Sequence, residues 1–127
     1  MTLTLASAIV DFHSNFSRVV VIYSAIIALW GLFLFARGAN PSPGYLGSLV
    51  IAEGVAVVQG ILGLVTRTQT SGPHDALHYL YGIVLVITLP SAYFYSSGGK
   101  ERRDSLIFAL AGLFMLGIGI RGITTGG

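Results

Sequence analysis

Four apolar stretches, each close to the length that crosses a bilayer, most constrain what this chain can fold into. They are 18 to 21 residues long, are separated by short polar or Gly/Pro-rich breaks, and cover residues 19–36, 45–65, 76–95 and 105–123. About 20 apolar residues in an α-helix span the hydrocarbon core of a membrane. Short connections also make consecutive helices antiparallel. The sequence therefore predicts an all-α integral membrane protein with one domain over residues 1–127, a four-helix transmembrane bundle with up-down-up-down topology.

The composition supports this prediction and excludes several classes of site. Only 9% of the 127 residues are charged and 54% are apolar, whereas a soluble domain carries about 25% charged residues. The chain has no cysteine, which excludes disulfides, thiolate metal sites, iron–sulfur clusters and cysteine nucleophiles. Seven Lys/Arg stand against five Asp/Glu, without a basic stripe, so nucleic acid is not an expected partner.

The segment 3–17, before the first apolar stretch, has the pattern of an amphipathic helix. Apolar residues follow a 4-3-4 spacing, which places them on one helical face; they are Leu5, Ile9, Phe12 and Phe16. Such a segment could lie flat at the membrane interface or extend the first span as a continuous helix. Extension is favoured, because no Gly or Pro interrupts the chain before Gly31.

The distribution of Lys and Arg predicts the orientation. The loops after the first and third spans carry Arg37, Lys100, Arg102 and Arg103, and residues 98–104 form the only dense positive cluster. Positive residues favour the cytoplasmic side, so this cluster is placed in the cytoplasm and both termini outside it. Four spans suggest a bacterial inner membrane.

All three histidines are predicted to lie at one membrane face. His13 precedes the first span, and His74 and His78 lie at the start of the third, which runs in the same direction. Three arginines share that face: Arg18, Arg67 and Arg121. The opposite face has no histidine, so titratable groups are concentrated at one end of the bundle.

Three interpretations of the histidine cluster remain open. His13 or His74 could pair with His78 as axial ligands of a b-type haem, with the arginines contacting its propionates, or the same face could hold a quinone. Alternatively, His74 and His78, at i and i+4 on a helix, could bind zinc or copper with help from His13 or an aspartate. In the third interpretation, the imidazoles only contact headgroups, water or loop carbonyls.

Glu53 and Gln59 are polar residues inside the second apolar stretch. A charge at this depth costs at least ~2.5–3.5 kcal/mol, and no basic residue lies at matching depth. Glu53 is therefore expected to be protonated or to bond a hydroxyl, with Tyr23, Ser24, Thr88 and Ser91 as candidates. It could relay a proton, bond a cofactor or join helices. Gln59 is expected to hold helices together, within a stripe of small residues: Ala52, Ala56 and Gly63. Close packing is also expected of the fourth-span glycines: Gly112, Gly117, Gly119 and Gly122.

The layout, carried by His13 and His78, looks like the small membrane-anchor and b-type cytochrome subunits of electron-transfer complexes. That resemblance implies a small membrane subunit of a respiratory or photosynthetic assembly with a haem b or quinone. Two alternatives stand beside it: a small oligomeric transporter or channel for protons or a metal ion that uses Glu53, and a purely structural accessory subunit. No nucleophile–base arrangement or phosphate-binding loop is present, so the chain is not expected to be a catalyst by itself. Its expected partners are membrane lipids and other membrane chains or further copies of itself.

Overall fold

The computed structural model is all-helical over the residues that it describes. It describes the backbone of residues 2–69 and 76–126, and the side chains of residue 5 and of residues 7–65 and 79–124. Four helices follow one another: α1 (Thr2–Ala36), α2 (Pro43–Gln69), α3 (Ala76–Tyr95) and α4 (Arg102–Gly126). Each coincides with one of the predicted apolar stretches, and residues 3–17 are part of α1.

Three of the helices are long and apolar enough to cross a membrane. The qualifying segments are Ser7–Ala36, Pro43–Val65 and Arg102–Thr124, and Tyr79–Tyr95 is a shorter apolar segment. With 35 residues and a rise of about 1.5 Å per residue, α1 is about 52 Å long, whereas the hydrocarbon core is ~30 Å thick. Large apolar side chains are exposed on all four helices, among them Leu29, Val50, Ile83 and Phe114. Such a surface is suited to lipid.

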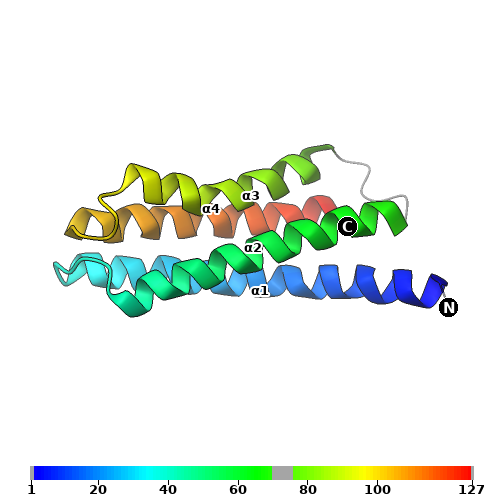
Figure 1. Ribbon diagram of the computed structural model, residues 1–127, viewed down its shortest axis with the longest axis horizontal. Helices are drawn as coiled ribbons and strands as arrows, with labels where there is room; N and C mark the ends of the chain where they lie inside the picture. Colours follow the sequence, from blue (N-terminus) through cyan, green and yellow to red (C-terminus); the bar gives the residue numbers. More distant parts are fainter. Residues whose placement is uncertain (1, 70–75, 127) are drawn as a thin grey trace.

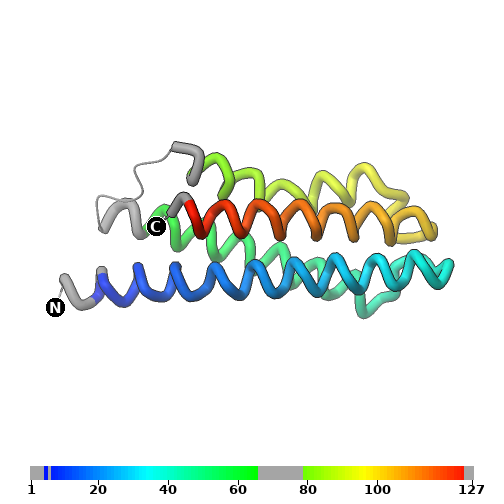
Figure 2. The backbone as a smooth tube through the Cα atoms, turned by 180° about the vertical axis from the view of Figure 1, so that it is seen from behind, coloured from blue at the N-terminus to red at the C-terminus, as the bar shows by residue number. Residues whose placement is uncertain are grey.

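The helices lie along the long axis of the molecule and pack as a ring. In this ring α1 packs on α2 and α4, and α3 also packs on α2 and α4, so α1 and α3 lie diagonally. The connections at 37–42 and 96–101 lie together at one end, which we call the loop end (Figure 1). Figure 2 shows α4 beside α1 along most of its length from the opposite side. The interface between α1 and α4 is the most extensive, and that between α2 and α3 is the smallest.

Glycines bring the backbones of α1 and α4 close together. A Cβ at Gly112 would lie 2.8 Å from the Ala28 nitrogen, and one at Gly31 would lie 2.9 Å from Ala109 Cβ. A Cβ at Gly119 would be 3.1 Å from Val21 Cγ2. The expected packing role is wrong for two other glycines of α4, since a Cβ at Gly117 or Gly122 would meet no described atom within 4 Å.

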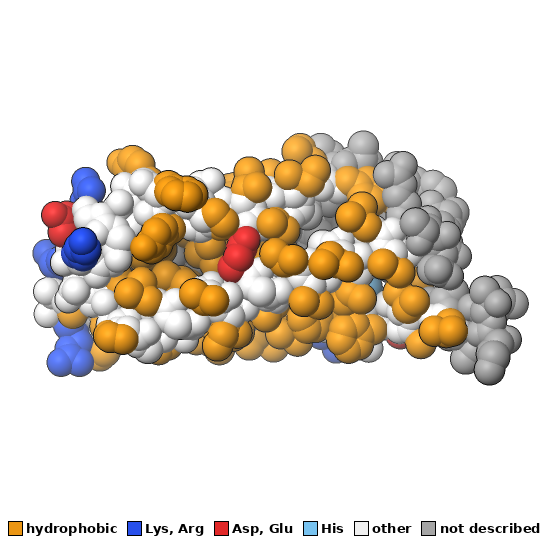
Figure 3. Space-filling model, viewed as in Figure 1, with side chains coloured by type: hydrophobic (Ala, Val, Ile, Leu, Met, Phe, Trp, Pro, Cys, Tyr) orange, Lys and Arg blue, Asp and Glu red, His pale blue; other side chains and the backbone are white. Residues whose placement is uncertain are grey.

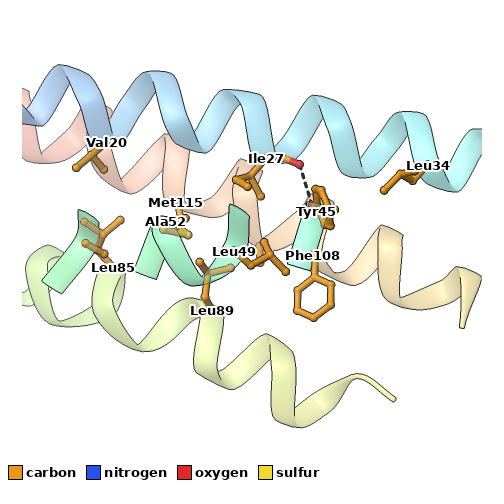
Figure 4. Close-up of a cluster of buried hydrophobic side chains, with 12 residues drawn as sticks. Val20, Ile27, Leu34, Tyr45, Leu49, Ala52, Leu85, Leu89, Phe108 and Met115 are labelled. Carbon is orange, nitrogen blue, oxygen red and sulfur yellow. Dashed lines mark hydrogen bonds between the residues drawn. The ribbon is translucent and has the colours of Figure 1, made fainter. Parts of the chain in front are cut away.

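Tyr45, near the start of α2, is buried in the core. Its side chain is 0% exposed, and its hydroxyl donates a hydrogen bond to the Ile27 carbonyl of α1 at 2.9 Å (Figure 4). The Trp30 ring meets it edge-on at 5.1 Å between centroids. The core continues along the bundle with buried apolar side chains from all four helices. Figure 4 labels Val20, Leu34, Leu49, Leu85, Leu89, Phe108 and Met115 among them.

Local sequence signals set the helix ends at the first connection. Gly38 has a φ of +74°, and the Ala39 and Gly38 amides donate to the carbonyls of Leu34 and Phe35. This is the Schellman arrangement that ends a helix at glycine. The next helix starts with Ser42, whose hydroxyl accepts from the Tyr45 amide at 3.2 Å, and with Pro43 at the first helical position, where no amide hydrogen is needed.

Asp104 organises the second connection. Its carboxylate is 0% exposed and accepts hydrogen bonds from the amides of Ser97, Gly99 and Glu101 at 3.0 to 3.2 Å. Gly98 and Gly99 have φ values of 74° and 87°, which glycine adopts readily. The carboxylate near the start of α4 therefore fixes the path of residues 97–101.

Candidate functional site

His13 lies between α1 and α2, in the half of the bundle away from the loop end. Its side chain is half-buried, and a Cβ at Gly63 would lie 3.4 Å from His13 Cε1. The ring therefore lies directly against the backbone of α2 at this glycine. Gln59, one turn earlier on α2, donates its side-chain amide to the His13 carbonyl at 3.1 Å. Both contacts fix the position of His13 relative to α2.

Two of the predicted arginines lie in the same half of the molecule. Gly119 of α4 packs on Val20 and Val21 of α1, so Arg121 and Arg18 lie on neighbouring turns of the two helices. Both side chains are exposed. The Arg121 guanidinium carbon lies 6.0 Å from the centre of the Tyr81 ring, within the range of a cation–π contact, and this contact links α4 to α3.

The remaining predicted ligands lie outside the described side chains. His74 is outside the described residues altogether, and only the backbones of Arg67 and His78 are described, within α2 and α3. Among the side chains that are described, no three His, Asp or Glu residues form a group able to hold a metal ion. The proposed pair of His74 and His78 is not part of that set.

Glu53 lies on the side of α2 that faces α3. Residues seven positions apart lie on the same side of a helix. The contacts of Leu46 and Gly60, seven positions before and after Glu53, therefore indicate which way Glu53 faces. A Cβ at Gly99 would lie 3.0 Å from a Leu46 methyl carbon, and one at Gly60 would lie 3.6 Å from Val86 Cγ2. Glu53 is near the middle of the Pro43–Val65 segment, and Figure 3 shows an acidic group amid apolar side chains midway along the molecule.

Two of the four hydroxyl partners expected for Glu53 donate to backbone carbonyls instead. Thr88 donates to the Val84 carbonyl at 2.6 Å, and Tyr23 donates to the Ser48 carbonyl at 3.2 Å. Within the described part of the chain, Glu53 Oε1 is buried and has no hydrogen-bond partner. A buried oxygen without a hydrogen-bond partner lowers the stability of the folded state. Glu53 Oε1 is such an atom on the side of α2 that faces α3.

Two buried polar residues were missed in the sequence. Tyr45 was assigned only to the beginning of an apolar stretch, and Asp104 only to a charged loop. The signal for Asp104 is its place three residues after Glu101, at the third helical position, where a carboxylate can reach back to the preceding amides. Tyr45 lies three residues after Ser42, close to the helix start, but no local pattern indicates its bond to α1.

Comparison of the chain with protein-family models, curated proteins and solved structures finds no match.

Proposed function

We propose that this protein is a small membrane subunit of an electron-transfer assembly, in which a b-type haem or a quinone binds at the end of the bundle that carries His13. All four helices cross a bacterial inner membrane in alternating directions, with the loop end in the cytoplasm and both termini outside it. Other membrane chains or further copies of this chain are its partners. The observation that carries the proposal is the contact of the half-buried His13 ring of α1 with α2 at Gly63.

The depth of the histidines supports a shared site. His13 lies 23 residues before Ala36 at the end of α1, and His78 lies 17 residues before Tyr95 at the end of α3. At about 1.5 Å per residue, these separations are about 34 and 26 Å, close to the ~30 Å thickness of the hydrocarbon core. Both residues thus lie near the membrane boundary opposite the loop end, on two diagonal helices.

The residues present fit the chemistry of a haem. Neutral imidazole is a good axial ligand for haem iron. The α1 imidazole lies against α2 at Gly63, and Gln59 bonds the backbone carbonyl of His13. His78 is the proposed second ligand, with His74 as the alternative. Arg18, Arg67 and Arg121 are the proposed partners of the propionates, because guanidinium groups form paired hydrogen bonds with carboxylates.

Absorption spectroscopy of the purified protein tests this proposal. After expression with added haem, we expect a Soret band that shifts on reduction with dithionite and is lost in His13→Ala and His78→Ala. Ser14→Ala is the matched control, because Ser14 is the exposed neighbour of His13. If the protein stays colourless and co-purifies with no quinone, the cofactor proposal is wrong and a purely structural accessory role is favoured.

A second candidate function follows from Glu53. The buried, unpartnered Oε1 atom midway through α2 is suited to accepting a proton or a small cation, because ionisable groups inside spans commonly mark ion pathways. In this alternative, the protein is a small oligomeric transporter or channel for protons or a metal ion.

Flux measurements in liposomes test the second candidate. Glu53→Gln is expected to abolish proton or metal-ion flux, whereas Glu101→Gln, which changes an exposed loop carboxylate, is expected to leave it unchanged. Equal flux in wild type and Glu53→Gln would remove Glu53 as the carrier.

A further inference from the structure

Positive charge is concentrated on the outside of the loop end. Four basic side chains are exposed there, and Glu101 is the one exposed acidic residue among the described residues of the two connections; the basic residues are Arg37, Lys100, Arg102 and Arg103. Figure 3 shows Lys and Arg side chains grouped at this end of the molecule. We call these four residues the basic rim.

The second carboxylate beside the basic rim, that of Asp104, is not on the outer surface. Asp104 is fully buried, and both of its oxygens accept hydrogen bonds from loop amides. The outer surface of the loop end therefore carries the four positive charges of the basic rim and the one negative charge of Glu101.

Contacts between the two connections hold the basic rim in place. Asn40 donates to the Gly99 carbonyl at 3.3 Å, and the Ser105 hydroxyl donates to the Ala39 carbonyl at 2.8 Å. Arg102 donates through Nε to the Phe35 carbonyl at 2.9 Å, and its guanidinium carbon lies 4.2 Å from the centre of the Phe35 ring. The charges are thus carried on a structured surface rather than on a loose tail.

Exposed aromatic residues border the basic rim at the end of α3. Tyr93, Phe94 and Tyr95 are 52%, 85% and 73% exposed, at the point where the apolar helix gives way to the loop. Tyrosines gather at the level of lipid headgroups. This border places the basic rim at the depth of the headgroup phosphates.

We propose that the basic rim binds the headgroups of anionic phospholipids. The ligand is the lipid phosphate, and the apolar surfaces of α3 and α4 accommodate its acyl chains. This inference depends on insertion of the bundle in a membrane and not on haem binding or transport. Clusters of Lys and Arg beside a membrane span attract anionic lipids by about fivefold in affinity for each charge.

Electron paramagnetic resonance of spin-labelled lipids around the full chain tests the proposal. We expect spin-labelled phosphatidylglycerol to associate more strongly than spin-labelled phosphatidylcholine. The preference for phosphatidylglycerol should fall by about fivefold in Lys100→Gln and by a similar factor in Arg103→Gln. It should persist in the charge-conserving Lys100→Arg and in Arg18→Gln, which removes a positive charge from the opposite half of the bundle.

Three results would overturn the proposal. The first is an equal association of both lipids with the wild type. The second is an equal loss of preference in Arg18→Gln and Lys100→Gln, which would assign the effect to net charge alone. The third is abolition of the preference by inorganic phosphate at matched ionic strength, which would indicate a site for the free anion. Circular dichroism of each variant confirms that the bundle is intact.

Discussion

At the scale of single residues, Gly112 lies so close to the backbone of α1 that a side chain has no room. A Cβ there would lie 2.8 Å from the nitrogen and 3.1 Å from the Cα of Ala28, and these backbone atoms cannot move without shifting α1. Overpacking of this kind costs about 1–3 kcal/mol. Gly112→Ala should therefore lower the free energy of unfolding by about that amount, measured by denaturant titration in detergent.

Gly117 provides the control for this prediction. It is on the same helix, and a Cβ there would meet no described atom within 4 Å. Gly117→Ala should leave stability unchanged or raise it slightly, because alanine favours the helix. Equal effects of the two substitutions would contradict the proposed close approach of α1 and α4.

Tyr45 offers a second test at the residue scale. Tyr45→Phe keeps the ring between Trp30 and Phe108 and removes only the hydrogen bond to the Ile27 carbonyl. We expect a loss of about 0.5–1.5 kcal/mol in the free energy of unfolding. Tyr95→Phe, at a 73% exposed tyrosine, should have little effect, and a comparable loss there would show that the bond in the core is not the cause.

The sequence identifies individual polar residues better than it identifies their partners. Glu53 stands out in the sequence because acidic residues are rare in apolar stretches, and His13 because all three histidines are predicted at one end of the bundle. The contact of His13 with Gly63 and the use of Tyr23 and Thr88 by carbonyls depend on how α1, α2 and α3 are rotated against one another. Rotation is set by side-chain packing across interfaces, which no local pattern specifies.

At the scale of elements, Asp104 connects α3 to α4. Asp104→Asn replaces two accepting oxygens by one oxygen and an amide, which cannot accept the same three amide hydrogens. A lost partner in a buried position costs about 1–3 kcal/mol. We expect faster hydrogen exchange at the amides of Ser97, Gly99 and Glu101, measured by mass spectrometry, together with lower stability.

Glu101→Gln is the matched control for the loop. The Glu101 side chain is exposed. The substitution removes one negative charge, as Asp104→Asn does, but no hydrogen bond to the loop amides, so hydrogen exchange at residues 97–101 should stay slow. Faster exchange in both variants would assign the effect to charge rather than to the hydrogen bonds of Asp104.

Helix positions were predictable from the sequence because apolar length and helix-end residues are local signals. The predicted stretch 45–65 corresponds to a helix that begins two residues earlier, at Pro43, and continues to Gln69. The unequal interfaces were not predictable. The four glycines of the predicted stretch 105–123 have the same local signature, yet among the described atoms Gly112 and Gly119 lie close to α1 and Gly117 and Gly122 do not.

At the scale of the whole molecule, the absence of cysteine permits a direct test of the number of crossings. Single cysteines at the exposed positions Ser7, Asn40, Lys100 and Thr124 can be labelled with a membrane-impermeant maleimide in intact cells. With four crossings, Asn40→Cys and Lys100→Cys should stay unlabelled on the cytoplasmic side, while Ser7→Cys and Thr124→Cys react. The wild type serves as the unlabelled control, and opposite behaviour of Asn40→Cys and Lys100→Cys would show that one of α2 and α3 does not cross.

The extensive interface between α1 and α4 has a consequence for biosynthesis. The first of the four helices to leave the ribosome finds its most complementary neighbour only when the fourth has been made. Until then, the side of α1 that carries Ala28 and Gly31 is open to lipid or to a chaperone. Its remaining contacts are with α2, which bonds α1 through Tyr45 and Gln59. The nascent chain should therefore be most vulnerable to membrane proteases late in translation, and assembly of the bundle should be completed in a single step when α4 arrives.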